Sequence, residues 1–292
     1  MTVNLKNYIK INQTILGPSN NIISPTLILF LISNSGIIIS TIGYNVFHMH
    51  GYLCFFINIL SLHLSGTVIH DAAHKTANKY PLLNTMMGHL SALILGFSFP
   101  VFTRVHMKHH ANVNDIQHDP DHFVSTGGPL WLIASRFFYH EVYFFQRKLW
   151  QKIELFKWLI ERLIFVLLLL TSVKYNFLDY VLKFWFCPAL IVGSFLGIFF
   201  DYLPHHPFKN KGKWNNSIIY PNILLNWLIL GQNYHLVHHL WPSVPWYNYQ
   251  KVYSENMKIL ELHTRSLKIK NLRQRNIFKF LYDLIIGIRL ED

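Results

Sequence analysis

The chain has few charged residues and few cysteines for its length. Of its 292 residues, 14% are Asp, Glu, Lys or Arg, and two are cysteine. A soluble domain usually carries about 25% charged residues, so the composition argues against one. Cys54 and Cys187 both lie in apolar stretches, where they act as small hydrophobic side chains. The sequence therefore predicts neither a disulfide framework nor a thiolate metal site.

Hydrophobic residues are abundant in this chain. Hydrophobic residues make up 51% of the chain, and five stretches suit helices: 25–47, 52–69, 85–102, 159–173 and 181–203. Crossing a bilayer takes about 20 apolar residues in a helix. There is no internal repeat, low-complexity segment or linker. We therefore expect an all-α integral membrane protein, a single domain over residues 1–292, with about four transmembrane helices.

Nine histidines fall in four short clusters beside these apolar stretches. Burying an imidazole without a partner is costly, and neutral imidazole is a good ligand for iron, copper, zinc or nickel. The repeated clustering therefore predicts a metal site that holds two ions. The candidate ligands are His70, His74, His106, His109, His110, His205, His235, His238 and His239.

The spacing within the clusters indicates how the imidazoles divide between two ions. His70 and His74 are four residues apart, which places them on one face of a helix. The triplets in 106–110 and 235–239 each have i, i+3 and i+4 spacing, and their adjacent members are rotated by about 100°. Adjacent imidazoles can therefore address different ions. Nine imidazoles exceed the ligands of two tetrahedral zinc ions, whereas two five- or six-coordinate irons accommodate them.

Asp201 precedes His205 by four residues, at the end of the last apolar stretch. This spacing makes Asp201 a candidate tenth ligand, either directly or through water. The alternative is a helix-end acid that pairs with a nearby base.

Other polar residues near the clusters are expected to play supporting roles. Pro120 disfavours a helix through 118–122, so His118 and His122 are not assigned as ligands. The histidines without cluster spacing are interpreted as hydrogen-bonded or interfacial residues: His48, His50, His63, His89, His140 and His263. Metal-bound histidines usually need acceptors that hold their tautomers, and simple solvation is the alternative for the candidates, which are Asp71, Asp119 and Asp121.

The positions of the clusters constrain the course of the chain. The nine histidines can meet only if every cluster emerges on the same side of the bilayer. A crossing at 85–102 would bring His106 out on the face opposite His70, so we expect that stretch to be interfacial or re-entrant. The histidine-bearing segments then form a helical cap. Lys and Arg gather on this side of the membrane, which indicates the cytoplasm or its plastid equivalent.

The formal net charge of +12 and the basic C-terminal end point to anionic partners. The basic residues flank apolar segments without a nucleic-acid motif, which favours lipid head groups and an acidic protein partner. The tail over 264–292, and within it 268–290, mixes basic and large apolar residues. It predicts an amphipathic helix on the membrane or, alternatively, a packed helix with a solvated face.

The histidine spacing resembles that of the membrane fatty-acid desaturase and hydroxylase superfamily, whose boxes read HxxxH, HxxHH and HxxHH with a further histidine after the last span. More specifically, residues 66–249 resemble the β-carotene hydroxylases of cyanobacteria and plastids in four contexts: FPVFTRVHMKHHANVND, HDPDHFVSTGGPLWLIASRFFYHE, FFDYLPHHPF and GQNYHLVHHLWPSVPWYNY. The resemblance implies a four-helix membrane stem beneath a cytosolic cap, and a non-haem di-iron centre with the nine clustered histidines as ligands.

The implied activity is that of a carotenoid β-ring 3-hydroxylase. Such an enzyme converts β-carotene through β-cryptoxanthin to zeaxanthin, using O2, two Fe2+ ions and electrons from ferredoxin. The implied location is a cyanobacterial thylakoid or plasma membrane, or a plastid membrane. Alternatives with the same iron chemistry are an acyl-lipid desaturase and a carotenoid ketolase. A metal transporter would instead place its ligands at the bilayer midplane, whereas these clusters follow the ends of spans.

Overall fold

The computed structural model describes residues 15–263 and 277–287, and every regular element within them is helical. The longer elements are α1 (Pro25–Phe47), α2 (Gly51–Ala73), α3 (Pro81–Leu95), α4 (Phe99–Asn112), α8 (Lys152–Lys174), α10 (Cys187–Leu196) and α14 (Tyr249–His263). The shorter α-helices are α5 (Pro120–Thr126), α6 (Ile133–Arg136), α7 (Tyr139–Gln146), α9 (Leu178–Val181), α11 (Leu203–His205), α12 (Ile223–Leu228), α13 (His235–Leu240) and α15 (Ile277–Ile285).

The described part of the chain also contains short 3₁₀ and π segments. Two of them are π-helical, η4 (Leu182–Phe186) and η5 (Gly197–Tyr202), and both lie inside one continuous helix from Leu178 to His205. Such local widening of an α-helix is frequent at functional sites. The 3₁₀ segments are η3 (Leu130–Leu132), η6 (Gln232–Tyr234) and η7 (Trp246–Asn248).

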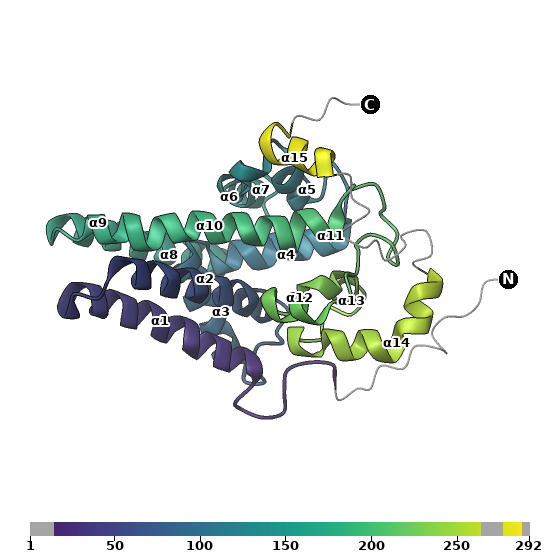
Figure 1. Ribbon diagram of the computed structural model, residues 1–292, viewed down its shortest axis with the longest axis horizontal. Coiled ribbons are helices and arrows are strands. Elements are labelled where there is room, and N and C mark those ends of the chain that lie inside the picture. Colours follow the sequence, from purple (N-terminus) through teal and green to yellow (C-terminus); the bar gives the residue numbers. More distant parts are fainter. Residues whose placement is uncertain (1–14, 264–276, 288–292) are drawn as a thin grey trace.

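An apolar stem carries a cap of shorter helices. Within residues 15–263 and 277–287, three helices are long and apolar enough to cross a membrane: α1, α2 and the continuous helix Leu178–His205. α8 has the same length as α1, but Glu161 and Arg162 interrupt it. Figure 1 shows α1, α2 and α10 along the long axis, with α12, α13 and α14 gathered at one end. The all-helical architecture with three or four candidate spans confirms the predicted fold class.

The stretch 85–102 is broken rather than straight. α3 and α4 are bent by 98° relative to each other. Gly96 ends α3 with a left-handed φ of 85°, which a residue without Cβ adopts readily. The bend returns the chain so that His106 Nε2 lies 2.8 Å from His74 Nε2. α4 therefore meets the end of α2, as the positions of the clusters require.

Polar side chains fasten α1 to its neighbours. Ser24 Oγ donates to the backbone oxygen of Ala77 at 2.7 Å. Farther along, Ser33 Oγ donates to the backbone oxygen of Ser61 at 2.7 Å and lies 2.6 Å from Ser65 Oγ. Polar residues in the first apolar stretch are therefore partnered inside the stem, and small polar residues of this kind are common between membrane helices.

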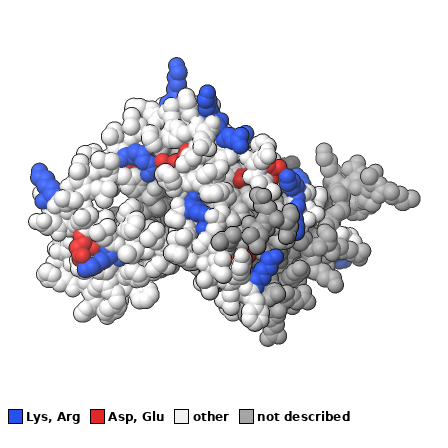
Figure 2. Space-filling model, turned by 90° about the horizontal axis from the view of Figure 1, so that it is seen from above, with Lys and Arg blue, Asp and Glu red and all other residues white. Residues whose placement is uncertain are grey.

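The surface of the stem is apolar. Figure 2 shows Lys and Arg widely spaced over a largely uncharged face of the molecule. A face with so few charges fits contact with lipid tails when its exposed side chains are also apolar. On α8, the side chains that are at least half exposed include Phe156, Leu163, Val166, Leu167, Leu168 and Leu170.

The C-terminal tail is described only over 277–287, where α15 packs on the cap. Phe280 and Leu284 contact a cluster that includes Leu130 and Ile133, whereas Phe278 is 80% exposed. One face of α15 therefore packs on the cap, as the packed-helix alternative predicts. The opposite face leaves large apolar side chains exposed. The predicted stretches 264–276 and 288–292 lie outside the described residues.

Candidate metal centre

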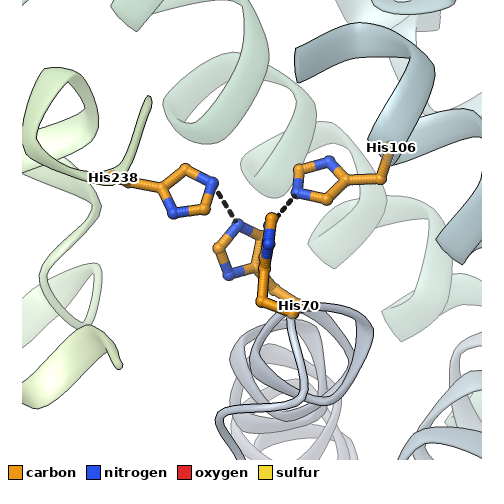
Figure 3. A group of neighbouring side chains, drawn as sticks. His70, His106 and His238 are labelled. Carbon is orange, nitrogen blue, oxygen red and sulfur yellow. Dashed lines mark hydrogen bonds between the residues drawn. The ribbon is translucent and has the colours of Figure 1, made fainter. Parts of the chain in front are cut away.

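Four helices deliver the nine clustered histidines to one place. The end of α2 carries His70 and His74, α4 and α13 carry the two triplets, and α11 carries His205. Figure 3 shows His70, His106 and His238 pointing toward one another from α2, α4 and α13. Seven of the nine are buried. Residues up to 168 positions apart in sequence thus come into direct contact.

The imidazoles form two groups of four. Within each group, one nitrogen from each ring lies within 4.8 Å of the corresponding nitrogens of the other three rings. Adjacent residues in the last triplet, His238 and His239, fall in different groups, as their rotation around a helix predicts. His110 borders the first group, because its Nε2 lies 3.1 Å from His106 Nε2 and 2.9 Å from His238 Nε2. The first group is His70, His74, His106 and His238, and the second is His109, His205, His235 and His239.

Two histidines of the second group present lone pairs to each other. His205 Nδ1–H donates to the backbone oxygen of Asn216 at 3.0 Å, and His235 Nδ1–H donates to Gln232 Oε1 at 3.3 Å. A neutral imidazole carries one proton, so both Nε2 atoms are unprotonated, yet they lie 3.0 Å apart. A cation between them removes the repulsion. Metal–nitrogen bonds of about 2.0–2.1 Å at right angles separate the nitrogens by about 2.9 Å, so the residues fit a metal ion.

Burial keeps the imidazoles of α13 neutral. It lowers the pKa of His235, His238 and His239 well below the usual 6.5, and neighbouring imidazoles lower each pKa further. Neutral imidazole is the form that binds metal. These three imidazoles can therefore bind a cation at neutral pH without first releasing protons.

Asp119 and Asp121 lie on the Nδ1 side of His109. Asp119 Oδ1 accepts from Nδ1–H at 2.9 Å, and Asp121 Oδ2 lies 3.4 Å from the same nitrogen. The backbone N–H of Asn114 holds Asp119 Oδ2 at 2.8 Å, and His140 Nε2–H donates to Asp121 Oδ1 at 2.8 Å. A carboxylate at Nδ1 leaves the lone pair on Nε2, which faces the centre.

Asp71 is placed differently from the other two aspartates. Its Oδ1 is 3.8 Å from His70 Nδ1, too far for a hydrogen bond, and neither atom has another partner among the described residues. Its Oδ2 accepts from Thr26 Oγ1 at 2.9 Å, and Trp246 Nε1 donates to that hydroxyl oxygen. Asp71 therefore joins α2 to α1 and to the cap, while its expected hydrogen bond to an imidazole is not formed.

A cavity of about 500 Å³ opens beside the two groups. Asp201, in η5, lines it together with His70, His106, His109 and His235, but Asp201 belongs to neither histidine group. Much of the remaining wall is apolar, which suits an apolar ligand. Its apolar residues include Leu95, Phe97, Phe137, Ala189, Leu196 and Phe200.

Among the residues whose side chains the structure describes, the histidines outside the four clusters lie outside both groups. His118, on the surface, pairs with Asp115 at 3.0 Å. Within the stem, His63 Nε2–H donates to the backbone oxygen of Leu228 at 3.0 Å, and His89 Nδ1 lies 2.6 Å from Glu161 Oε1. The interpretation as hydrogen-bonded residues is confirmed for His63 and His89.

The sequence did not single out several residues that hold the imidazoles. Tyr249 OH lies 2.9 Å from His238 Nδ1, Gln232 bonds His235, and the backbone oxygen of Asn216 bonds His205. His140 reaches the centre through Asp121. A tyrosine or amide near a histidine box is too common to signal this role, and a backbone carbonyl leaves no trace in the sequence.

Comparison with known proteins finds relatives among desaturases and carotenoid ketolases. The sn-1 oleoyl-lipid 12-desaturase of Picosynechococcus sp. is 25% identical over 237 residues, covering 65% of this chain and 66% of that protein. The chloroplastic omega-6 fatty acid desaturase of Arabidopsis thaliana is 26% identical, covering 61% of this chain and 47% of that protein. The beta-carotene ketolase of Paracoccus sp. (strain PC1) is 29% identical, covering 62% of this chain and 69% of that protein. The chain thus spans less than two thirds of the first relative and about half of the second.

Residues 47–269 match the family described as fatty acid desaturase, and this range contains all nine clustered histidines. It also contains two of the three candidate spans in full. Sequence match, apolar stem and converging imidazoles agree with one another. The chain belongs to the fatty acid desaturase family.

Proposed function

We propose that the two histidine groups hold two iron ions and that the protein hydroxylates C3 of the carotenoid β-ring, taking β-carotene through β-cryptoxanthin to zeaxanthin. One observation carries the metal assignment: imidazoles from four helices converge with Nε2 atoms 2.8 to 3.3 Å apart. Lone pairs at such distances need a cation between them. Nine imidazoles favour two ions of coordination number above four.

The proposed ligands divide along the two groups. One ion would take the first group with His110, and the other would take the second group. Asp201 would complete the second site, directly or through water, because it lines the adjoining cavity. Asp119 and Asp121 would keep His109 in its ligand tautomer.

Bound iron would supply the two-electron activation of O2 that hydroxylation of an unactivated C–H bond requires. The chain itself positions the substrate and excludes water. Phe97, Phe137 and Phe200 line the cavity, so an apolar ring displaces water beside the histidines. Fixing that ring near the centre lowers the entropic cost of the reaction.

Two observations favour a carotenoid ring as substrate. The first is that the stretch 118–141, on which the proposed resemblance to β-carotene hydroxylases partly rests, contributes Ala134, Ser135, Phe137 and Phe138 to the cavity wall. In addition, two of the relatives are beta-carotene ketolases, each 29% identical to this chain.

Desaturation of an acyl lipid is the second candidate function. The relatives include sn-1 oleoyl-lipid 12-desaturases from several cyanobacteria, at 23 to 25% identity. The same centre and an apolar cavity would serve that reaction. The two functions differ in product, a hydroxylated carotenoid or a new double bond in a fatty acid.

The proposed electron donor is a ferredoxin-type protein. Basic residues at the histidine-bearing end, among them Lys75, Arg104, Lys108 and Lys209, suit an acidic partner. We assign this end to the cytoplasm or the plastid stroma, because Lys and Arg accumulate in loops on that side of a membrane. The proposed location is a cyanobacterial thylakoid or plasma membrane, or a plastid membrane.

Expression in carotene-accumulating bacteria that also supply a ferredoxin tests the activity. The expected result is loss of β-carotene with gain of its 3-hydroxylated products, abolished by His109→Ala and retained by the surface control His118→Ala. Fatty acids from the same cells are profiled in parallel. Folded, iron-loaded protein with unchanged carotenoids overturns the proposal, and new acyl double bonds would establish the second candidate.

A further inference from the structure

A charged pair lies in the wall of the cavity beside the metal centre. Glu141 of α7 and Arg162 of α8 both line this cavity, and Arg162 Nη2 donates to Glu141 Oε1. Their side chains keep 23% and 26% of their exposed area, so a molecule in the cavity can reach them. Placing an ion pair in a mostly apolar wall costs desolvation free energy that apolar residues would avoid. This cost suggests a role in binding.

Glu141 and Arg162 have donor and acceptor positions that their mutual hydrogen bond does not use. Arg162 has five N–H donors; its Nη1 donates to the backbone oxygen of Gly96 at 3.3 Å, and its buried Nε has no partner among the described residues. Glu141 Oε2 accepts from Trp158 Nε1 at 3.4 Å, a long contact. Together the two side chains can still donate to one group and accept from it.

We propose that Glu141 and Arg162 form a subsite for a hydroxyl group on a lipophilic substrate. The charges of the pair cancel, so a neutral group fits better than a carboxylate or phosphate. A hydroxyl matches both partners, because its oxygen accepts from Arg162 and its hydrogen donates to Glu141. The cavity thereby selects a substrate that already carries an oxygen. The substrate's identity as a monohydroxylated carotenoid rests on the proposed function, whereas the hydroxyl chemistry rests on the pair.

α7 connects this subsite to the metal centre. His140, the residue before Glu141, donates to Asp121, and Asp121 lies 3.4 Å from His109 Nδ1. One short helix therefore contacts both places. A ligand held by its hydroxyl at Glu141 and Arg162 therefore lies in the cavity that His70, His106, His109 and His235 also line.

Equilibrium binding to the full chain in lipid nanodiscs tests the subsite, with ligand amounts expressed per lipid. The probes are two matched pairs, β-carotene with β-cryptoxanthin, and octadecane with 1-octadecanol as competitors. The wild-type protein is expected to bind the hydroxylated member of each pair about tenfold more tightly. Arg162→Met and Glu141→Gln should bring that ratio to about one. Arg104→Gln, which breaks a pair with Glu154 between α4 and α8 away from the cavity lining, should leave it unchanged.

The affinity ratio separates binding from a structural role. A wild-type ratio of one overturns the subsite, and so does a lower melting temperature in Arg162→Met with the ratio intact. If Arg162→Met does not fold, Arg162→Lys keeps the charge with fewer donors, and the ratio must still fall. Discrimination of hydroxylated probes without carotenoid hydroxylation upholds the subsite and rejects the proposed function. Hydroxylation of carotenoids by a protein that binds both members of each probe pair equally well rejects the subsite and upholds the proposed function.

Discussion

His109 Nδ1–H donates to Asp119 Oδ1 at 2.9 Å, and both side chains are almost completely buried. The carboxylate fixes the proton on Nδ1, so Nε2 presents its lone pair 3.3 Å from His239 Nε2. This contact sets the tautomer and the ring orientation of an imidazole at the centre of the site. The proposed metal centre therefore depends on the aspartate as well as on the histidines.

Asp119→Asn is expected to weaken iron binding by about 10- to 100-fold, because an amide keeps the shape but loses the charge that holds the Nδ1 proton. Asn also retains the cap that Asp119 forms at the start of α5, so the fold should survive. Iron retained against increasing chelator measures the effect. Asp115→Asn, at the exposed pair with Lys211, is the matched control. Equal iron retention in the two variants would contradict the assigned role.

His106→Ala and His239→Ala should each remove roughly one of the two ions, since the two residues belong to different groups. Both variants should lose activity, because oxygen chemistry needs the complete pair. Elemental analysis of purified protein counts the ions, with His118→Ala as the control outside both groups. Loss of all metal from one variant with no loss from the other would show that the groups do not hold separate ions.

Tyr249→Phe removes the hydroxyl 2.9 Å from His238 Nδ1 without emptying the space of the ring. We expect a loss of about tenfold in iron affinity, the lower end for partners of metal-bound histidines. Tyr247→Phe is the comparison, because its hydroxyl accepts from the backbone N–H of Ser19. The assignment fails if the two variants retain iron equally well.

Gly88→Ala should disturb the bend between α3 and α4. A Cβ at Gly88 would overlap the ring of Phe99, which is buried at the start of α4. The expected cost is about 1–3 kcal/mol of stability, with lower iron retention because α4 carries a histidine triplet. Thermal melting and iron content measure both effects. Leu82→Ala, 84% exposed on the same helix, should change neither, and a Gly88→Ala variant that behaves like it would contradict this packing argument.

Spacing rules predicted the helical stem and the shared helix face of the histidines within one cluster, because both depend on local geometry. Four residues make about one helical turn, so His70 and His74 share a face whatever the tertiary structure. The requirement that all clusters meet on one side also indicated that 85–102 turns back, and the 98° bend agrees.

Contacts between distant segments could not be predicted in this way. Asp71 lies next to His70 in sequence, yet its carboxylate bonds Thr26, because α1 packs alongside α2. Tyr249 and His140 support the centre only because α14 and α7 pack against it. The charged pair of Glu141 and Arg162 forms because α7 and α8 both pack against α4, for which the sequence has no local signal.

The iron content of purified, active protein tests the central claim most directly. Elemental analysis should find two iron ions per chain, and their removal by a chelator should abolish activity until iron is restored. Active protein without iron, or with one tetrahedral zinc ion per chain, would contradict the account.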